Sequence, residues 1–281
     1  MRQPLMPIAK SVLIAAVLAT VVWVSAGSLT PPVGPVAPTM KNLSDVEPRI
    51  AIRNQFDTLT PVLINFSGSF YLAEDILALP GQNGITIDAA HVTLDLNGFT
   101  VYGNLEVGSQ AGIFINDNRH NITIRNGTVR DFNWYGVYGA ISDGGILEDV
   151  RVINNGLQGI YLRNFALVRD CTAINNGTED GIRVNSYSVV TGCVAWSNGN
   201  DLNDAGIRVA GAAGVVANCV AADNAGNGIR VGSASTITGS SALNNIGNGL
   251  DASSVGHVVD STASGNAINI SATSVHNSFG P

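Results

Sequence analysis

The chain has 281 residues, of which 45% are hydrophobic, 12% are charged and 6% are aromatic, with a formal net charge of −7. Typical domains carry about 25% charged residues, so this sequence lacks the Lys, Glu and Arg that amphipathic surface helices need. Its plentiful apolar residues exclude a disordered chain. Glycine and asparagine contribute 32 and 29 residues, and both favour tight turns, so the composition predicts an all-β chain with many corners.

The first 26 residues have the three parts of an export signal. Arg2 and Lys10 form a basic start, residues 11–24 are apolar, and Val24-Ser25-Ala26 presents small residues for cleavage. The apolar run is shorter than the roughly 20 residues that cross a bilayer. We therefore expect residues 1–26 to be a signal peptide and the mature chain to be exported, to the periplasm, the cell surface or the medium. We expect no membrane span in the mature chain.

Residues 27–60 are expected to form a Pro-rich N-terminal linker, because residues 29–38 hold four prolines. Without Arg2 and Lys10 the mature chain has 12 basic residues (14 − 2) and 21 acidic residues, a net charge of −9. This balance argues against nucleic acid or an anionic membrane as the main partner. The folded domain is expected to span residues 61–281.

A short motif recurs through the second half of the chain: a glycine followed by apolar, outward and apolar residues. It reads GIFI at 112, GVYG at 136, GIYL at 159, GIRV at 181, 206 and 228, and GLDA at 249. The spacings are 24, 23, 22, 25, 22 and 21 residues. Each segment alternates with period 2 and is too short for a helix, so it predicts a strand. Short strands at a fixed period near 22 residues predict a β-solenoid of stacked coils.

The segments ITIDAAHVTLDLNGFTVYG (85–103) and NITIRNGTVRDF (121–132), with the GIRV coils, resemble the right-handed parallel β-helix repeats of the pectate-lyase-like superfamily. The resemblance covers roughly residue 61 to the C-terminus. It implies an all-β, single-stranded right-handed parallel β-helix with about 8–9 coils of about 22 residues. It does not specify an activity, because this superfamily includes lyases, hydrolases, epimerases and adhesins.

Two columns of the repeat are expected to point inward and to stack into a continuous apolar core. The first holds Ile113, Val137, Ile160, Ile182, Ile207, Ile229 and Leu250, and the second holds Ile115, Leu162, Val184, Val209 and Val231. Cys171, Cys193 and Cys219 share a column with Val150, Ser240 and Ser261, which predicts buried, unreactive thiols rather than a metal cluster.

A recurrent asparagine ends the second repeated segment of each coil. The members are Asn155, Asn176, Asn198, Asn224, Asn245 and Asn266. Asparagine tolerates the left-handed backbone conformation and carries both a donor and an acceptor in its side chain. We therefore expect these residues to form a turn ladder in which each amide bonds the next coil.

One outward position per coil lies between the two inward columns. This outward column consists of Phe114, Tyr138, Tyr161, Arg183, Arg208, Arg230 and Asp251. Neighbouring strands lie about 4.8 Å apart, so the stripe would be roughly 29 Å long. Rings pack against apolar sugar faces and Arg pairs with carboxylates. We therefore expect all of these residues except Asp251 to bind an acidic polysaccharide; the alternative is a solvated face copied by duplication.

Four acidic residues lie next to the outward column in the sequence. Glu179 and Asp180 precede one GIRV motif, and Asp201 and Asp204 precede the next, on an inserted turn that lengthens the coil to 25 residues. Carboxylates from adjacent coils are suitable ligands for Ca²⁺. They are equally suited to pair with the arginines, and the sequence leaves both alternatives open.

Two functions remain open from the sequence. The first is an exported protein that binds an acidic polysaccharide and cleaves it by β-elimination. For this the resemblance implies Ca²⁺ on the uronate carboxylate and an arginine as base, which by position would be Arg183 or Arg208. The second is a non-catalytic structural or adhesive module of the cell envelope or surface. The nearly minimal coils favour the second function.

Overall fold

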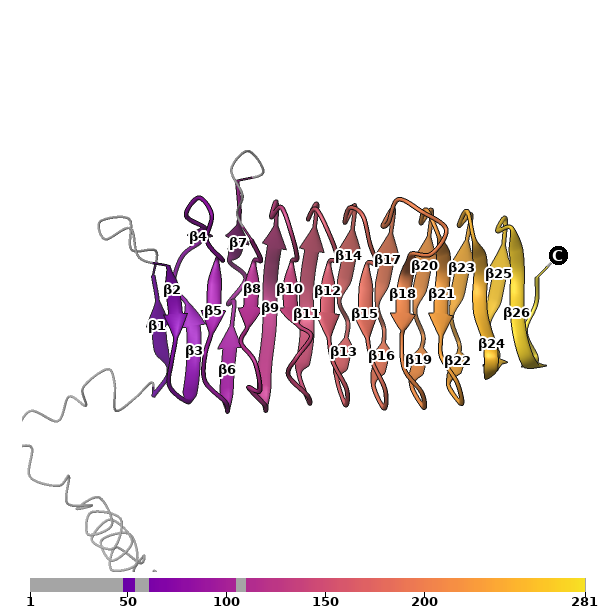
Figure 1. Ribbon diagram of the computed structural model, residues 1–281, viewed down its shortest axis with the longest axis horizontal. Helices are drawn as coiled ribbons and strands as arrows, with labels where there is room; N and C mark the ends of the chain where they lie inside the picture. The colour runs from indigo at the N-terminus through magenta and orange to yellow at the C-terminus, as the bar shows by residue number, and fades with distance from the viewer. Residues whose placement is uncertain (1–47, 54–60, 105–109, 281) are drawn as a thin grey trace, which may run out of the picture. The chain divides into compact units, whose positions relative to one another are not determined.

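In the computed structural model, residues 48–53, 61–104 and 110–280 are described, and they belong to one unit, Pro48–Pro281. The expected signal peptide, residues 1–26, and most of the expected linker lie outside the described residues. All regular elements of the described part are strands, which stack into an elongated solenoid (Figure 1). No helix suited to crossing a membrane occurs in this part of the chain.

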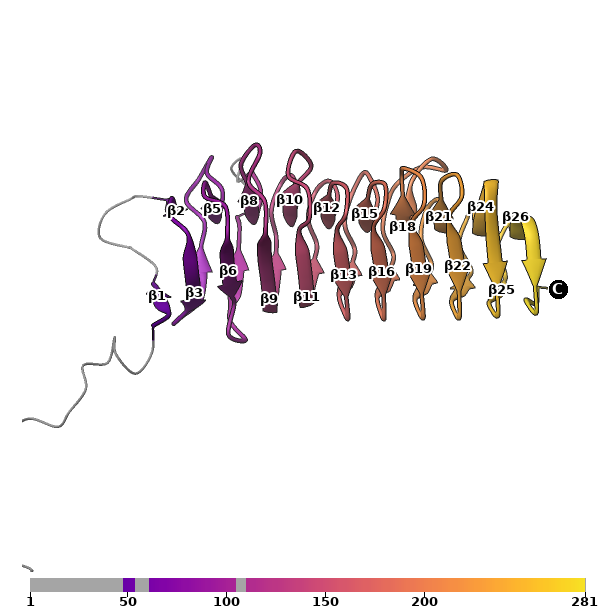
Figure 2. The same ribbon diagram turned by 90° about the horizontal axis from the view of Figure 1, so that it is seen from below.

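The solenoid has three faces, and every strand pairing between coils is parallel, as the short alternating segments predict (Figure 2). The first face carries the Gly-apolar-outward-apolar motif. Its strands are β2 (Val62–Ile64), β5 (Ile85–Ile87), β8 (Ile113–Ile115), β10 (Val137–Gly139), β12 (Ile160–Leu162), β15 (Ile182–Val184), β18 (Ala205–Val209), β21 (Asn227–Val231), β24 (Asn248–Val259) and β26 (Ile268–His276).

The second and third faces are built from the remaining strands and from long strands that run on across a corner. The second face contains β1 (Ile50–Ile52), β3 (Gly68–Leu72), β6 (Val92–Asp95), β9 (Ile122–Arg130), β11 (Ile146–Ile153), β13 (Leu167–Arg169), β16 (Val189–Thr191), β19 (Val215–Ala217), β22 (Thr236–Thr238) and the distal parts of β24 and β26. The third face contains β4 (Ile76–Leu77), β7 (Thr100–Tyr102), the distal parts of β9 and β11, β14 (Thr172–Ile174), β17 (Val194–Trp196), β20 (Val220–Ala222), β23 (Ser241–Leu243) and β25 (Thr262–Ser264).

The all-β solenoid and both inward columns are confirmed. Every residue of the two columns is buried in one continuous apolar core. The solenoid is longer than the expected 8–9 coils: the first face stacks the ten strands named above. It also reaches further towards the N-terminus than residue 61, because Ile50–Ile52 pairs with Phe70–Leu72 of β3. That segment lacks the repeat motif, so the sequence pattern predicted that it belongs to the linker.

The recurrent glycine of the motif is required by close packing between coils. A Cβ atom placed on Gly159 would lie 2.6 Å from the carbonyl oxygen of Gly181, and one on Gly181 would lie 2.7 Å from that of Gly206. No side chain fits at such distances from a backbone atom. The glycines therefore let successive coils approach to hydrogen-bonding distance on the first face.

The asparagine ladder forms as expected. The side-chain amide of Asn176 donates to Asn198 Oδ1 at 2.9 Å, and that of Asn198 donates to Asn224 Oδ1 at 3.1 Å. The same oxygens also accept backbone N–H groups, from Asn176 and Asn198 respectively. One detail of the expectation is wrong: the left-handed conformation belongs to the preceding residue, such as Asn175 (φ 51°) or Ser197 (φ 56°). The ladder asparagine is therefore selected for its side chain.

The cysteine column lies inside the solenoid, as predicted, and its three thiols are free and buried. The backbone N–H of Cys193 donates to the sulfur of Cys219 at 3.4 Å, and the N–H of Cys219 donates to Ser240 Oγ at 3.1 Å. The cysteine sulfur and the serine hydroxyl oxygen thus accept equivalent backbone hydrogen bonds in successive coils. Hydrogen bonding to Cys171, together with burial, raises the pKa of the Cys193 thiol to about 12.

Candidate functional site

The outward column is one continuous row on the first face, in the register that the repeat predicts. Tyr138 pairs with Phe114 and with Tyr161, and Tyr161 pairs with Arg183. Arg183, Arg208 and Arg230 are then paired in sequence, and Asp251 follows Arg230. The six residues predicted to bind substrate are therefore brought together, with the aromatic rings at one end and the guanidinium groups at the other.

The aromatic end is a packed cluster. The Phe114 and Tyr138 rings stack with centroids 5.2 Å apart, and Tyr161 meets Tyr138 edge-on at 5.9 Å. Tyr135, which lies outside the predicted column, packs against Tyr138 with ring centroids 4.6 Å apart. Its only signal in the sequence is its place immediately before the motif glycine Gly136. Burial, followed by the nearby charge of Glu179, raises the pKa of the Tyr135 hydroxyl.

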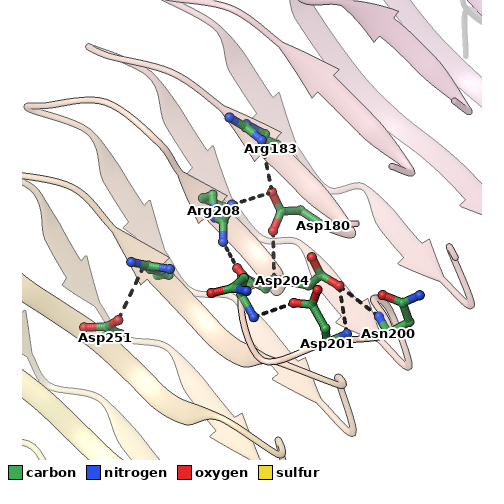
Figure 3. A network of polar contacts seen from close by, with 10 residues as sticks. Asp180, Arg183, Asn200, Asp201, Asp204, Arg208 and Asp251 are labelled. Carbon is green, nitrogen blue, oxygen red and sulfur yellow. Dashed lines mark hydrogen bonds and ion pairs between the residues drawn. The ribbon is translucent and has the colours of Figure 1, made fainter. Parts of the chain in front are cut away.

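Asp180 joins two arginines of adjacent coils. Its Oδ2 lies 3.4 Å from Arg208 Nη1 and 3.9 Å from Arg183 Nη1, while its Oδ1 accepts the backbone N–H of Ala205 at 2.8 Å (Figure 3). The Arg183 guanidinium also lies over the Tyr161 ring, 4.9 Å from its centroid. The aromatic and basic halves of the outward column are therefore in direct contact.

Burial dominates the electrostatics of this carboxylate. Asp180 is only 1% exposed, and its desolvation raises the pKa to about 6, although Arg208 and Arg183 act in the opposite direction. Its Oδ2 has no hydrogen bond, and the Nε atoms of Arg183 and Arg208 are likewise buried without a hydrogen-bond partner. The arginine end therefore contains polar atoms whose hydrogen-bonding capacity is not fully used.

The inserted turn covers Arg208. Asn203 accepts a hydrogen bond from Arg208 Nη2 through its backbone carbonyl, and the Arg208 side chain is only 16% exposed. Burial accordingly lowers the pKa of Arg208, with Asp180 opposing that shift. Arg208 is thus far less accessible than its outward position alone predicts.

The expected Ca²⁺ ligands do not gather around a common point. Asp204 Oδ2 accepts the backbone N–H groups of Asn200 and Asp201, and Asp201 Oδ1 accepts that of Asn203 (Figure 3). Among the described residues, no three His, Cys, Asp or Glu side chains meet in an arrangement that fits a metal ion. The carboxylates of Asp201 and Asp204 instead accept backbone N–H groups within the inserted turn.

A depression of about 320 Å³ opens over the arginine end of the outward column. Arg183, Arg208 and Arg230 line it together with Ser254 and the residues at the ends of β18 and β21, which are Val209, Ala210, Val231 and Gly232. Arg230 Nε lies 3.6 Å from Asp251 Oδ2, and the Arg230 side chain is 46% exposed. The depression is therefore a polar surface on which an anionic group can meet several guanidinium donors.

The chemistry of the arginine end favours binding over proton abstraction. An arginine serves as a base only after losing its proton. Burial lowers the pKa of Arg208, but Asp180 opposes that shift, and the ordinary pKa of an arginine lies far above neutral pH. A charged guanidinium offers paired donors that match a carboxylate. The arrangement is suited to holding an anion rather than to deprotonating a sugar.

The sequence pattern of one protein family, the "Right handed beta helix region", matches residues 74–214 and again 111–279. The chain belongs to the right-handed β-helix family. The right-handed β-helix repeat expected from the sequence is thereby confirmed. No curated protein matches this β-helix in sequence.

Three solved structures resemble this β-helix at low sequence identity. The Dettilon tailspike protein (gp208) has a TM-score of 0.55 and 15% identity, over 77% of this chain and 47% of its own. The pectate lyase Pel9A has a TM-score of 0.49 and 16% identity, over 82% and 66%. The A-module of the Azotobacter vinelandii mannuronan C-5 epimerase AlgE4 has a TM-score of 0.39 and 14% identity, over 76% and 87%. The β-helix thus spans about half the length of the tailspike and about two thirds of the lyase.

Proposed function

We propose that this β-helix binds an extended acidic polysaccharide along the outward column of its first face, without cleaving it. The observation that carries the proposal is the shared carboxylate of Asp180. Arg183 and Arg208 both pair with it, so its single negative charge compensates only one of the two adjacent guanidinium charges. Arg230 adds a more accessible guanidinium in the next coil. A row of anionic sugar units offers carboxylates to this end and apolar ring faces to the aromatic end.

The experiment compares two charge-equivalent variants. Arg230→Ala removes an exposed guanidinium from the outward column, whereas Arg151→Ala removes an exposed one from β11 on the third face. Purified protein is titrated with acidic and neutral polysaccharides at two salt concentrations, and its thermal stability is followed in parallel. Arg230→Ala should weaken binding of acidic chains by about 1–3 kcal/mol, the range of a charge-assisted contact, and Arg151→Ala should not. Binding should weaken as salt rises.

Equal affinity of wild type and Arg230→Ala, or no affinity for any acidic chain, would overturn the proposal. The outward column would then be a solvated face, and the structural or adhesive module would be the better function. Cleavage is tested on the same mixtures, with and without Ca²⁺, by following the absorbance of unsaturated products. Their appearance in wild type would show β-elimination and contradict binding without cleavage.

A further inference from the structure

A second aromatic pair lies at a corner of the solenoid, outside the outward column. Phe165 lies in the turn between β12 and β13, and Tyr187 lies in the equivalent turn between β15 and β16, one coil further on (Figure 1). The two rings stack with centroids 5.2 Å apart and an interplanar angle of 9°. Both residues are 59% exposed, so this stack does not contribute to the core.

The turn itself does not require an aromatic residue. Phe165 and Tyr187 have φ values of 56° and 59°, in the left-handed region that bulky side chains rarely adopt. The register of the second face aligns them with smaller residues of other coils that share this conformation. They include Gly144, Ala213, Ala234 and Val255, and the column also contains Asn121 and His91. The same backbone thus forms with glycine or alanine, and the two rings serve no evident need of the fold.

Both outer ring faces of the stack are flanked by small residues. In the same column, Gly144 precedes Phe165 by one coil and Ala213 follows Tyr187 by one coil. Backbone hydrogen bonds to the next coil fix the turns: Phe165 N–H donates to Ser186 at 3.0 Å and Tyr187 N–H donates to Ala212 at 2.9 Å. The rings are therefore held on a rigid frame with room beside them, as a stacking platform requires.

The surroundings of the stack are polar and electrically balanced. Arg163 Nε lies 3.6 Å from Asp143 Oδ1, and the Asn164 side-chain amide donates to the same oxygen at 3.1 Å. The half-buried Asn185 lies two residues before Tyr187. Hydrogen-bonding groups around a flat apolar surface suit a ligand with one apolar face and a rim of hydroxyl groups. The paired charges give no preference for an anion.

From this geometry we propose that Phe165 and Tyr187 form a second carbohydrate subsite, which stacks a neutral pyranose ring. The subsite is independent of the arginine end of the outward column and of the acidic ligand proposed for it. Because stacking involves no net charge, its affinity is insensitive to salt, unlike the attraction of acidic chains to the arginines.

The test uses replacements that the fold already contains in this column. The double variant Phe165→Ala/Tyr187→Ala reproduces Ala213 and Ala234, and Tyr187→Gly reproduces Gly144. The control is Ile246→Ala, which removes an exposed apolar side chain from a turn after the third face. A panel of immobilised neutral oligosaccharides identifies a binder for wild type, and this oligosaccharide is then titrated at two salt concentrations.

We expect the double variant to lose at least about tenfold in affinity for the neutral oligosaccharide, with Ile246→Ala and Arg230→Ala unchanged. The double variant should stay folded with a thermal midpoint close to that of wild type, because Ala213 and Ala234 already adopt this backbone conformation. The midpoint of Tyr187→Gly should not fall below that of wild type, because glycine relieves the left-handed backbone. The proposed subsite would be overturned if wild type bound no neutral oligosaccharide, or if the double variant bound the oligosaccharide as tightly as wild type does. The acidic ligand would remain separately testable through Arg230→Ala.

Discussion

Asp180 is the residue on which the charge of the candidate site depends. Its carboxylate lies between Arg183 and Arg208 and is almost fully buried. Burial places its pKa at about 6, so its charge changes within the physiological range rather than near the ordinary aspartate value of 3.8. Above about pH 6 the ionised carboxylate offsets the charge of one guanidinium group. Below that pH the carboxyl group is protonated and offsets neither guanidinium charge.

Binding of polyuronate should therefore strengthen as the pH falls from 7.5 to 5. Protonation of Asp180 removes one negative charge from the arginine end, while most uronate carboxylates stay ionised. A change of one nearby charge, worth about 1.4 kcal/mol, corresponds to about tenfold in affinity. The measurement is a titration with polyuronate at several pH values. Asp180→Asn should bind at pH 7.5 as wild type does at pH 5, and its affinity should change little with pH.

The same group gives a prediction for stability whose sign follows from its raised pKa. The native state holds the Asp180 proton more tightly than the unfolded chain, so its contribution to the free energy of unfolding falls as the pH rises from about 4 to about 6. Urea denaturation of wild type and Asp180→Asn across this range isolates the contribution. A difference between the two proteins that stays constant with pH would contradict the raised pKa.

Cys193 tests the inward assignment of its column. Cys193→Ser should change the free energy of unfolding by less than about 1.5 kcal/mol, because Ser240 and Ser261 already occupy equivalent buried positions. Cys193→Arg should prevent folding, because it buries an unpaired charge. In native protein all three thiols should resist a labelling reagent until denaturant is added. Rapid labelling without denaturant would show that this column faces solvent.

At the scale of an element, the asparagine ladder connects coil to coil at one corner. Asn198 is fully buried; it accepts from the backbone and side chain of Asn176 and donates to Ala173 and Asn224. Asn198→Ala should therefore lower the free energy of unfolding by about 1–3 kcal/mol, because it leaves buried donors and an acceptor unsatisfied. Denaturant unfolding measures this loss.

Asn200 provides the control for that experiment. It is exposed and lies in the inserted turn, only two residues from the ladder. Asn200→Ala should leave the free energy of unfolding within about 0.5 kcal/mol of wild type. Similar losses for both variants would mean that the ladder adds nothing beyond what any asparagine near this corner adds.

The repeat made the strands and their inward and outward columns predictable, because period-2 alternation and coil spacing fix which side chains meet. Features outside the repeat were not predictable. β1 has no motif glycine, and the shape of the inserted turn depends on which backbone N–H groups Asp204 accepts. Burial of Asp180 depends on the adjacent coil, and Phe165 and Tyr187 lie at a turn position that alanine or glycine fills elsewhere.

At the scale of the whole chain, export remains a prediction. We expect the mature protein to begin at Gly27, because Val24 and Ala26 are the small residues that a signal peptidase accepts. Expression of the full sequence, followed by N-terminal sequencing or intact mass measurement of the exported protein, gives the answer. Retention of Met1–Ala26 in the exported form would contradict this prediction.

The parallel pairing of every strand with the next coil also determines how the molecule bears a load. Hydrogen bonds between coils lie along the solenoid axis. A force applied between the two ends of the solenoid therefore acts on one coil junction at a time, whereas a force applied across the axis is shared by many coil junctions. Each coil that detaches releases about 22 residues, or roughly 75 Å of extended chain. Stretching a single molecule by its ends should therefore produce a series of small, evenly spaced steps at low force, and pulling across the axis should meet much greater resistance.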